Sequence, residues 1–234
     1  MPDADRSLAH QIDYYRARTP EYDQWWKRQG RYDRGDANQR SHEQAQQVAV
    51  ALEDHAPFGE TLELACGTGW WTQQLAPHAD ALTAIDASPE AIDLCRQRCG
   101  DHIRFQTADL FAWQPDRQYD FVFFSFWLSH VPDDRFDAFW HAVRRALRPS
   151  GRAFFIDSLP SPESRARDHA VADPAATTQT RRLNDGRTFE IVKIYHDPDT
   201  LQRRLEGLGW RVALSTTADF FQYGVLSPQP QSHP

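Results

Sequence analysis

The sequence is poor in cysteine and has no excess of positive charge. Its three cysteines form no C-x-x-C pair, which argues against both a disulfide framework and a zinc site. Its 26 Lys and Arg face 33 Asp and Glu, so the formal net charge is −7. Because proteins that bind nucleic acids usually present a basic surface, we expect no nucleic-acid partner.

The sequence also lacks a long apolar run. No stretch approaches the roughly 20 apolar residues that a membrane-spanning helix needs, and the start MPDADRSLAHQIDYY lacks the charged-then-apolar order of a signal peptide. We therefore expect a cytoplasmic protein with no membrane partner. A chain of 234 residues that is 40% hydrophobic and 12% aromatic can build a sizeable core, and its length fits one α/β domain. Nothing in the sequence indicates the oligomeric state.

Short apolar segments alternate with helical patterns from residue 60 onward. They predict strands at 60–65, 81–86, 103–109, 119–126 and 151–158, followed by two closing strands at 210–216 and 220–227. This alternation predicts an α/β fold with a Rossmann-like doubly wound sheet, mostly parallel with an antiparallel edge strand. In such a sheet, the ligand binds beyond the carboxyl ends of the strands.

The chain divides into three parts around this pattern. Residues 1–54 are predicted to form an N-terminal helical lid segment, whose last helix starts at Ser41 with a capping box. Residues 55–227 are predicted to be the core, with an insertion at about 158–195. Residues 228–234 are predicted to be a disordered tail.

A loop with two glycines follows the first predicted strand. In Glu63-Leu-Ala-Cys-Gly67-Thr-Gly69, the glycines permit a tight turn and a close approach of the backbone to a ligand. A dinucleotide-binding loop would carry a third glycine where this chain has Thr72. The carboxylate of Glu63 would also repel a phosphate but attract an amino group. The loop therefore argues against a dinucleotide-dependent oxidoreductase and favours a ligand with a cationic amino acid end.

Two further acids end the next two predicted strands. Asp86 stands where an acidic side chain accepts hydrogen bonds from ribose hydroxyls. Asp109 can accept from an adenine amino group, while the backbone N–H of Leu110 donates to the ring. The inferred ligand contains an amino acid, a ribose and an adenine. The alternative is that all three acids are only surface charges at strand ends.

On these residues the chain resembles the class I S-adenosylmethionine-dependent methyltransferases of the small-molecule type. The matching segments are ELACGTG (63–69), AID (84–86), ADL (108–110), YDFVFFSFWLSHVP (119–132) and LRPSG (147–151). The resemblance implies S-adenosyl-L-methionine as cofactor, S-adenosyl-L-homocysteine as its product, and no metal. Ala65 departs from the glycine that many members carry. The cofactor-binding residues that the resemblance and the strand-end pattern imply are Glu63, Ala65, Gly67, Gly69, Asp86, Ala87, Asp109, Leu110 and Phe126.

The end of the fourth predicted strand and the N-terminal helices bear on the acceptor. Ser125-Phe-Trp-Leu128 lacks the D/N-P-P-Y/F of members that methylate nucleic acids, and Asp157 stands alone where metal-dependent members have clustered acids. The aromatic N-terminal helices either cover the sheet edge or form a lid over the cofactor, where aromatic rings attract a sulfonium and stack on planar substrates. The expected substrate or lid residues are Tyr14, Tyr22, Trp25, Trp26 and Trp127.

His130 is the candidate catalytic residue. It lies four residues beyond Phe126, and a histidine with its usual pKa of about 6.5 can take a proton from a hydroxyl or amine. The alternative is that it only fixes the turn before Pro132. We expect methyl transfer to a small aromatic or heterocyclic molecule. Other chemistry on S-adenosylmethionine, such as alkyl cyclisation, and a non-catalytic adenosyl-ligand binder are the competing hypotheses.

Overall fold

A computed structural model describes residues 2–169 and 176–230. Within these ranges, a seven-stranded sheet has the order β3-β2-β1-β4-β5-β9-β8. Strands β1 to β5 run parallel, whereas β9 runs antiparallel to both β5 and β8. The predicted mixed sheet, mostly parallel with an antiparallel edge, is confirmed. The strands are β1 (Gly59–Leu64), β2 (Ala79–Asp86), β3 (Arg104–Thr107), β4 (Tyr119–Ser125), β5 (Leu147–Ser158), β8 (Trp210–Thr216) and β9 (Phe221–Pro228).

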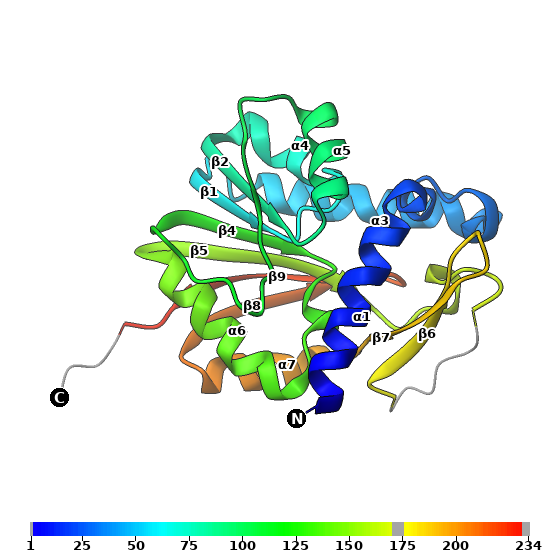
Figure 1. Ribbon diagram of the computed structural model, residues 1–234. Helices are drawn as coiled ribbons and strands as arrows, with labels where there is room; N and C mark the ends of the chain where they lie inside the picture. The colour runs from blue at the N-terminus through cyan, green and yellow to red at the C-terminus, as the bar shows by residue number, and fades with distance from the viewer. Residues whose placement is uncertain (1, 170–175, 231–234) are drawn as a thin grey trace.

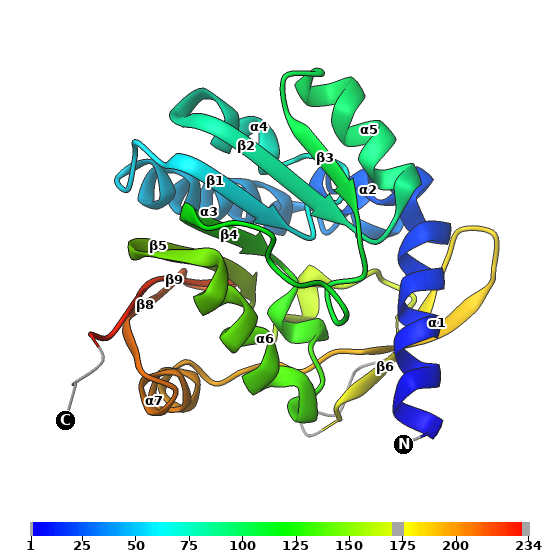
Figure 2. The same ribbon diagram turned by 60° about the vertical axis from the view of Figure 1, so that its left-hand side comes forward.

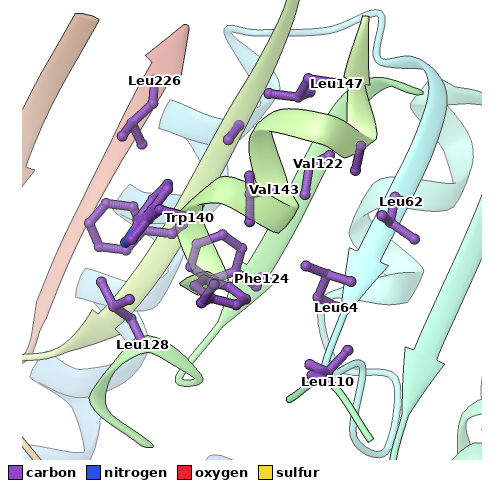
Figure 3. Close-up of a cluster of buried hydrophobic side chains, with 14 of the residues drawn as sticks. Leu62, Leu64, Leu110, Val122, Phe124, Leu128, Trp140, Val143, Leu147 and Leu226 are labelled. Carbon is purple, nitrogen blue, oxygen red and sulfur yellow. The ribbon is translucent and has the colours of Figure 1, made fainter. Parts of the chain in front are cut away.

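Helices cover both faces of the sheet (Figure 1). One face is covered by α3 (Asp36–Glu53), α4 (Thr72–Leu75) and α5 (Pro89–Cys99), and the other by α6 (Asp133–Ala146) and α7 (Pro198–Gly207). The side chains of β4 alternate between the two resulting cores. Phe121 and Phe123 pack toward α3 and α5, while Val122 and Phe124 pack toward α6 (Figure 3). A central parallel strand is apolar on both faces for this reason.

The N-terminal segment and the insertion meet beyond the carboxyl ends of the parallel strands (Figure 2). The N-terminal segment contains α1 (Pro2–Arg18), η1 (Thr19–Glu21), α2 (Asp23–Trp26) and η2 (Gly30–Tyr32), and the insertion contains η5 (Pro162–Ser164) and the hairpin of β6 (Thr178–Arg182) and β7 (Thr188–Val192). Tyr14 of α1 packs on Leu183 and Ile191 of the hairpin in a small separate core. This contact holds the two segments together at the place where a ligand should bind.

Several predicted boundaries are wrong. The sequence predicts that Asp109 ends a strand at 103–109, but β3 ends at Thr107, so Asp109 lies in the loop that follows it. Ser41 lies inside α3, which begins at Asp36 after a left-handed Gly35 (φ 60°). Its supposed capping partner Gln44 instead accepts hydrogen bonds from the backbone N–H groups of Asp219 and Phe220 at 3.0 and 3.1 Å. Strand β5 starts at Leu147 rather than at residue 151, because α6 ends directly into it. The predicted tail begins too early, since Pro228 ends β9; residues 231–234 of that tail lie outside the described part of the chain.

Candidate active site

A pocket opens at the carboxyl ends of β1, β2 and β4, beneath α1. Its empty volume is about 750 Å³ including the open mouth. We call it the strand-end pocket. Seven of the nine predicted cofactor-binding residues line it, together with Gln11, Ile12, Tyr15 and Thr19 from the N-terminal segment. The seven are Ala65, Gly67, Asp86, Ala87, Asp109, Leu110 and Phe126.

The loop after β1 and the side chain of Asp86 form one wall of this pocket. Ala65 and Gly67 both have left-handed backbone conformations, with φ of 55° and 54°. This turns the Gly67 N–H toward Asp86, whose Oδ2 accepts from it at 2.8 Å, while Oδ1 accepts from the Ser88 N–H at 2.8 Å. Burial raises the pKa of Asp86. A carboxylate has about four lone-pair sites, so Asp86 has acceptor capacity beyond these backbone contacts for the hydroxyls of a diol.

Glu63 and Gly69 do not line the strand-end pocket. Glu63 is 1% exposed, and its Oε2 has no hydrogen-bond partner among the described residues. Burial raises its pKa well above the usual value, and a buried carboxyl oxygen without a hydrogen-bond partner is costly. The predicted contact of Glu63 with the cofactor's amino group stays a prediction. At Gly69 (φ 87°), an added Cβ would lie 2.8 Å from the Cys95 Sγ, so this glycine serves the packing of the loop on α5.

A second pocket lies beside the first, between the N-terminal helices and the hairpin. Its empty volume is about 590 Å³ with its open mouth. We call it the cationic pocket, because Arg18, Arg165, Arg181 and Lys193 line it and, among the described residues, no Asp or Glu does. Side chains shared by both pockets form the wall between them; these are Tyr15, Tyr22, Phe126 and His130.

Arg18 lies among tyrosine rings in the cationic pocket. Its guanidinium carbon is 4.7 Å from the ring centre of Tyr22 and 5.7 Å from that of Tyr14, and its Nη2 donates to the Tyr32 hydroxyl at 3.4 Å. The Arg18 Nε and the Tyr14 hydroxyl are both buried and have no partner in the described part of the chain. Buried polar groups normally have hydrogen-bond partners. These two donors therefore indicate a ligand with acceptor atoms.

Lys193 is held at the cationic pocket by a buried network. Its Nζ donates to the Ser129 Oγ at 2.7 Å and lies 3.6 Å from the Asp157 Oδ1. Asp157 also accepts from the Ser129 N–H at 2.8 Å. Asp157, which stands alone in the sequence, thus balances the charge of a lysine. No group of His, Cys, Asp and Glu within residues 2–169 and 176–230 could hold a metal ion.

His130 lies at the shared wall, with both ring nitrogens engaged. Its Nδ1 is 2.6 Å from the Val192 carbonyl oxygen, and its Nε2 is 2.7 Å from the Tyr15 hydroxyl. Burial, with a further contribution from the charge of Lys193, lowers the pKa of His130 well below its usual value. Its predicted role as a base stays a prediction. The alternative role, holding the turn, is compatible with these contacts.

The predicted substrate and lid residues divide between the pockets. Tyr14, Tyr22 and Trp25 line the cationic pocket, and Trp127 lines the strand-end pocket. Trp26 lines neither pocket, because it is buried and stacks on Trp70 with ring centres 4.9 Å apart. The predicted site residues do not include Tyr15, Arg18, Arg181 or Lys193, although Tyr15 belongs to the aromatic N-terminal helices that are predicted to cover the sheet edge or form a lid. For Arg18 a signal existed: Tyr14, Arg18 and Tyr22 recur every four residues, which places the first two on one helix face.

Comparisons of the sequence with known proteins find methyltransferases. The family model described as "Methyltransferase domain" matches residues 61–151. Nodulation protein S of Rhizobium tropici is 30% identical over 116 residues, which are 47% of this chain and 48% of that protein. The chain spans about half the length of the curated relatives it matches. Demethylmenaquinone methyltransferase of Tropheryma whipplei is 32% identical over 101 residues, which are 40% of this chain and 39% of that protein. These matches do not favour alkyl cyclisation.

Two solved structures match over nearly the full length. The DhpI-SAH complex is 37% identical, with a TM-score of 0.77 and coverage of 96% of this chain and 98% of that one. The DhpI-SAM-HEP complex is 38% identical, with a TM-score of 0.80 and coverage of 95% and 98%. No helix in the described ranges is long and apolar enough to cross a membrane. On the basis of these sequence and structure matches, the chain belongs to the S-adenosylmethionine (SAM)-dependent methyltransferases, which use SAM as cofactor and release S-adenosyl-L-homocysteine (SAH).

Proposed function

We propose that this protein transfers the methyl group of SAM to a small acceptor that carries an anionic group, such as a carboxylate or a phosphate-type oxyanion. The observation that carries this proposal is the set of unpartnered donors in the cationic pocket, the Arg18 Nε and the Tyr14 hydroxyl. They lie among basic side chains with no acid lining the same pocket in the described part of the chain. A ligand with only acceptor atoms and a negative charge complements such a site.

The residues of the strand-end pocket fit SAM. The free lone pairs of Asp86 suit ribose hydroxyls. Glu63 lies behind the pocket lining, and we assign it to the amino group of SAM only as the resemblance implies. The left-handed turn at Ala65 and Gly67 brings backbone atoms to the pocket wall. When bound, SAM supplies an electrophilic methyl group on a sulfonium. We assign Asp109 and Leu110 to the adenine, as the resemblance implies.

The chain's own contribution to the reaction is alignment. Arg18 and Arg181 would attract the anion and orient it, and Lys193, whose charge Asp157 offsets, would serve as a further hydrogen-bond donor. Orientation matters because methyl transfer needs the nucleophile, the methyl carbon and the sulfur in line. The wall between the pockets, with Tyr22 and Phe126, is where the reacting atoms would meet away from water. An anionic oxygen needs no general base. This agrees with the engagement of both His130 nitrogens.

We assign the N-terminal segment to a lid over both pockets. Side chains of α1 line each of them. In the loop after β1, the Thr68 Oγ1 donates to the Asp23 Oδ1 of α2 at 2.7 Å. The aromatic or heterocyclic acceptor expected from the sequence stays a prediction. The rings of Tyr22 and Trp25 offer flat surfaces to such a molecule, so an aromatic acid would satisfy both the rings and the cations.

Matched acids and amides test the proposal. The protein is incubated with SAM and with pairs such as benzoate and benzamide, and SAH formation is measured. We expect acids to be methylated and their amides to be inert. A binding test that needs no turnover uses the SAH complex, whose melting temperature should rise with benzoate or inorganic phosphate but not with benzamide. Methylation of neutral members at the same rate as acids would contradict the anionic acceptor.

A further inference from the structure

Tyr15 occupies the place where the two pockets join. It comes from α1, is half-buried, and lines both the strand-end pocket and the cationic pocket. Its ring meets the His130 ring edge-on, with centres 5.3 Å apart and planes at 76°. A group transferred from one pocket to the other must pass this wall, so the hydrogen-bonding state of the Tyr15 hydroxyl matters.

The contacts of His130 fix the direction of the Tyr15 hydrogen. A carbonyl oxygen can only accept, so the His130 Nδ1 at 2.6 Å from the Val192 oxygen carries the ring hydrogen. Burial and the cations around it keep this histidine neutral by lowering its pKa, and Nε2 is then an acceptor. The Tyr15 hydroxyl at 2.7 Å must donate to it. The hydrogen of Tyr15 is thus committed, and its oxygen can offer only lone pairs to a ligand.

This makes Tyr15 different from the donors around it. Arg18, Arg181 and Lys193 present positive charge to the cationic pocket, and the Tyr14 hydroxyl there is unpartnered. A lone pair among these groups is unsuited to an anion, because two electron-rich oxygens repel each other. It suits a positively polarised ligand group. The methyl of a sulfonium is such a group, since the adjacent positive charge polarises its C–H bonds, and C–H···O contacts are weakly attractive.

We propose that Tyr15, oriented by His130, is a positioning residue whose phenol oxygen contacts the sulfonium methyl group, so that the protein distinguishes SAM from SAH. SAH has neither the methyl group nor the positive charge, and it gains nothing from this oxygen. The contact favours loading of the methylated cofactor over its product. It also points the methyl group at the cationic pocket. The inference rests on the SAM cofactor and not on the chemical class of the acceptor.

The test is the affinity for the two cofactor forms, measured by titration calorimetry without an acceptor. Tyr15→Phe removes the oxygen and keeps the ring. We expect the Kd for SAM to rise about fivefold and the Kd for SAH to change less than about twofold. Tyr223→Phe, at a tyrosine of β9 that lines neither pocket, should leave the ratio of the two Kd values unchanged.

A second variant tests the role of His130. His130→Leu removes the acceptor that commits the Tyr15 hydrogen, so the preference for SAM should fall, and adding Tyr15→Phe should cause no further fall. Equal loss of SAM and SAH affinity in Tyr15→Phe would show that Tyr15 only packs against the cofactor. Unchanged affinity for both would place its oxygen away from the methyl group. Either result overturns the proposal, while the methylation of acids can be assayed separately.

Discussion

The strand-end pocket and the cationic pocket share one wall but differ in chemistry. Asp86 and Asp109 line the first, and the second is lined by arginines and Lys193 with no acid from the described residues. Carboxylates accept hydrogen bonds and attract a cation, whereas guanidinium and ammonium groups donate and attract an anion. Under the proposed function, the two ligands would carry opposite charges and lie on opposite sides of Tyr15 and Tyr22. Attraction between these ligands then favours the encounter that methyl transfer needs.

Removing a charge from the cationic pocket alone is the strongest test of the proposed difference between the two pockets. Arg18→Met keeps most of the side-chain volume and deletes the guanidinium. Losing a buried, charged hydrogen-bond partner costs about 2–5 kcal/mol, so kcat/KM for the acid acceptor should fall about 30- to 4,000-fold. The Kd for SAM, measured by calorimetry, should stay within about twofold.

Arg16→Met is the matched control for this change. Arg16 is two residues away on the same helix, its side chain is 47% exposed, and it pairs with Glu90 on the surface. Exposed ion pairs contribute about 0–1 kcal/mol, so turnover should change little. A similar loss in both variants would mean that Arg18 acts through the helix and not through the acceptor.

The reverse experiment removes the acid from the strand-end pocket. Asp86→Ala deletes the acceptor for ribose hydroxyls, and hydrogen bonds to charged groups contribute about 1.5–3 kcal/mol. We expect the Kd for SAM to rise about 10- to 100-fold, while benzoate or phosphate still stabilises the free protein. Asp93→Ala, at an exposed acid of α5 that pairs with Arg96, should bind SAM normally. An unchanged Kd in folded Asp86→Ala would refute the ribose assignment.

The strand-end pocket could be predicted from the sequence because its residues follow the strands that carry them. Asp86 ends β2, and Ala65 and Gly67 directly follow β1. The carboxyl ends of neighbouring parallel strands always meet at one edge of the sheet. A strand pattern therefore predicts which loops come together, and the motifs within the loops predict their ligand. Ala65 shows the limit of the motif, since it takes the left-handed conformation that glycine would take more easily.

The cationic pocket could not be predicted in this way. Arg18, Arg181 and Lys193 come from a helix, a hairpin strand and the segment after that hairpin. They meet only because α1 packs on the hairpin through Tyr14. No local period or spacing links residues more than 160 positions apart along the chain. For the same reason, the sequence predicts His130 as a proton acceptor without showing that it has a hydrogen-bond partner. That partner, Tyr15, lies 115 residues away along the chain.

The two histidines of the cationic pocket should make stability depend on pH. Burial lowers the pKa of His130 well below its usual value and that of His169 to about 4. The unfolded chain, in which histidine titrates near about 6.5, then binds more protons than the folded chain in the window between these values. Stability is therefore fully present above that window, and acidification removes it by up to about 1.4 kcal/mol per pH unit for each histidine.

Urea unfolding at pH 7.5, 6.5 and 5.5 measures this effect. The histidines should lower the free energy of unfolding on acidification, whereas the raised pKa of Glu63 acts in the opposite direction in wild type and variant alike. Over this range the free energy of unfolding of His130→Gln should therefore fall by about 1 kcal/mol less than that of wild type. Gln can still accept a hydrogen bond from Tyr15, which separates titration from packing. His141→Gln, at an exposed position of α6, is the control. Equal slopes in wild type and His130→Gln would show that His130 keeps its ordinary titration in the folded protein.

The smallest effect should come from the backbone of the strand-end pocket. Ala65 holds φ at 55°, a conformation that costs a residue with a Cβ about 1–2 kcal/mol. Ala65→Gly removes this strain but adds about 0.4–1 kcal/mol of unfolded-state entropy. We expect a net gain of about 0.5–1 kcal/mol, which is about 1–4 °C in Tm for a chain of this size. Ala218→Gly, at an exposed position without a positive φ, should lower Tm instead. If both glycines lowered Tm alike, Ala65 would hold no strain. The loop after β1 would then be no more strained than an ordinary exposed position such as Ala218.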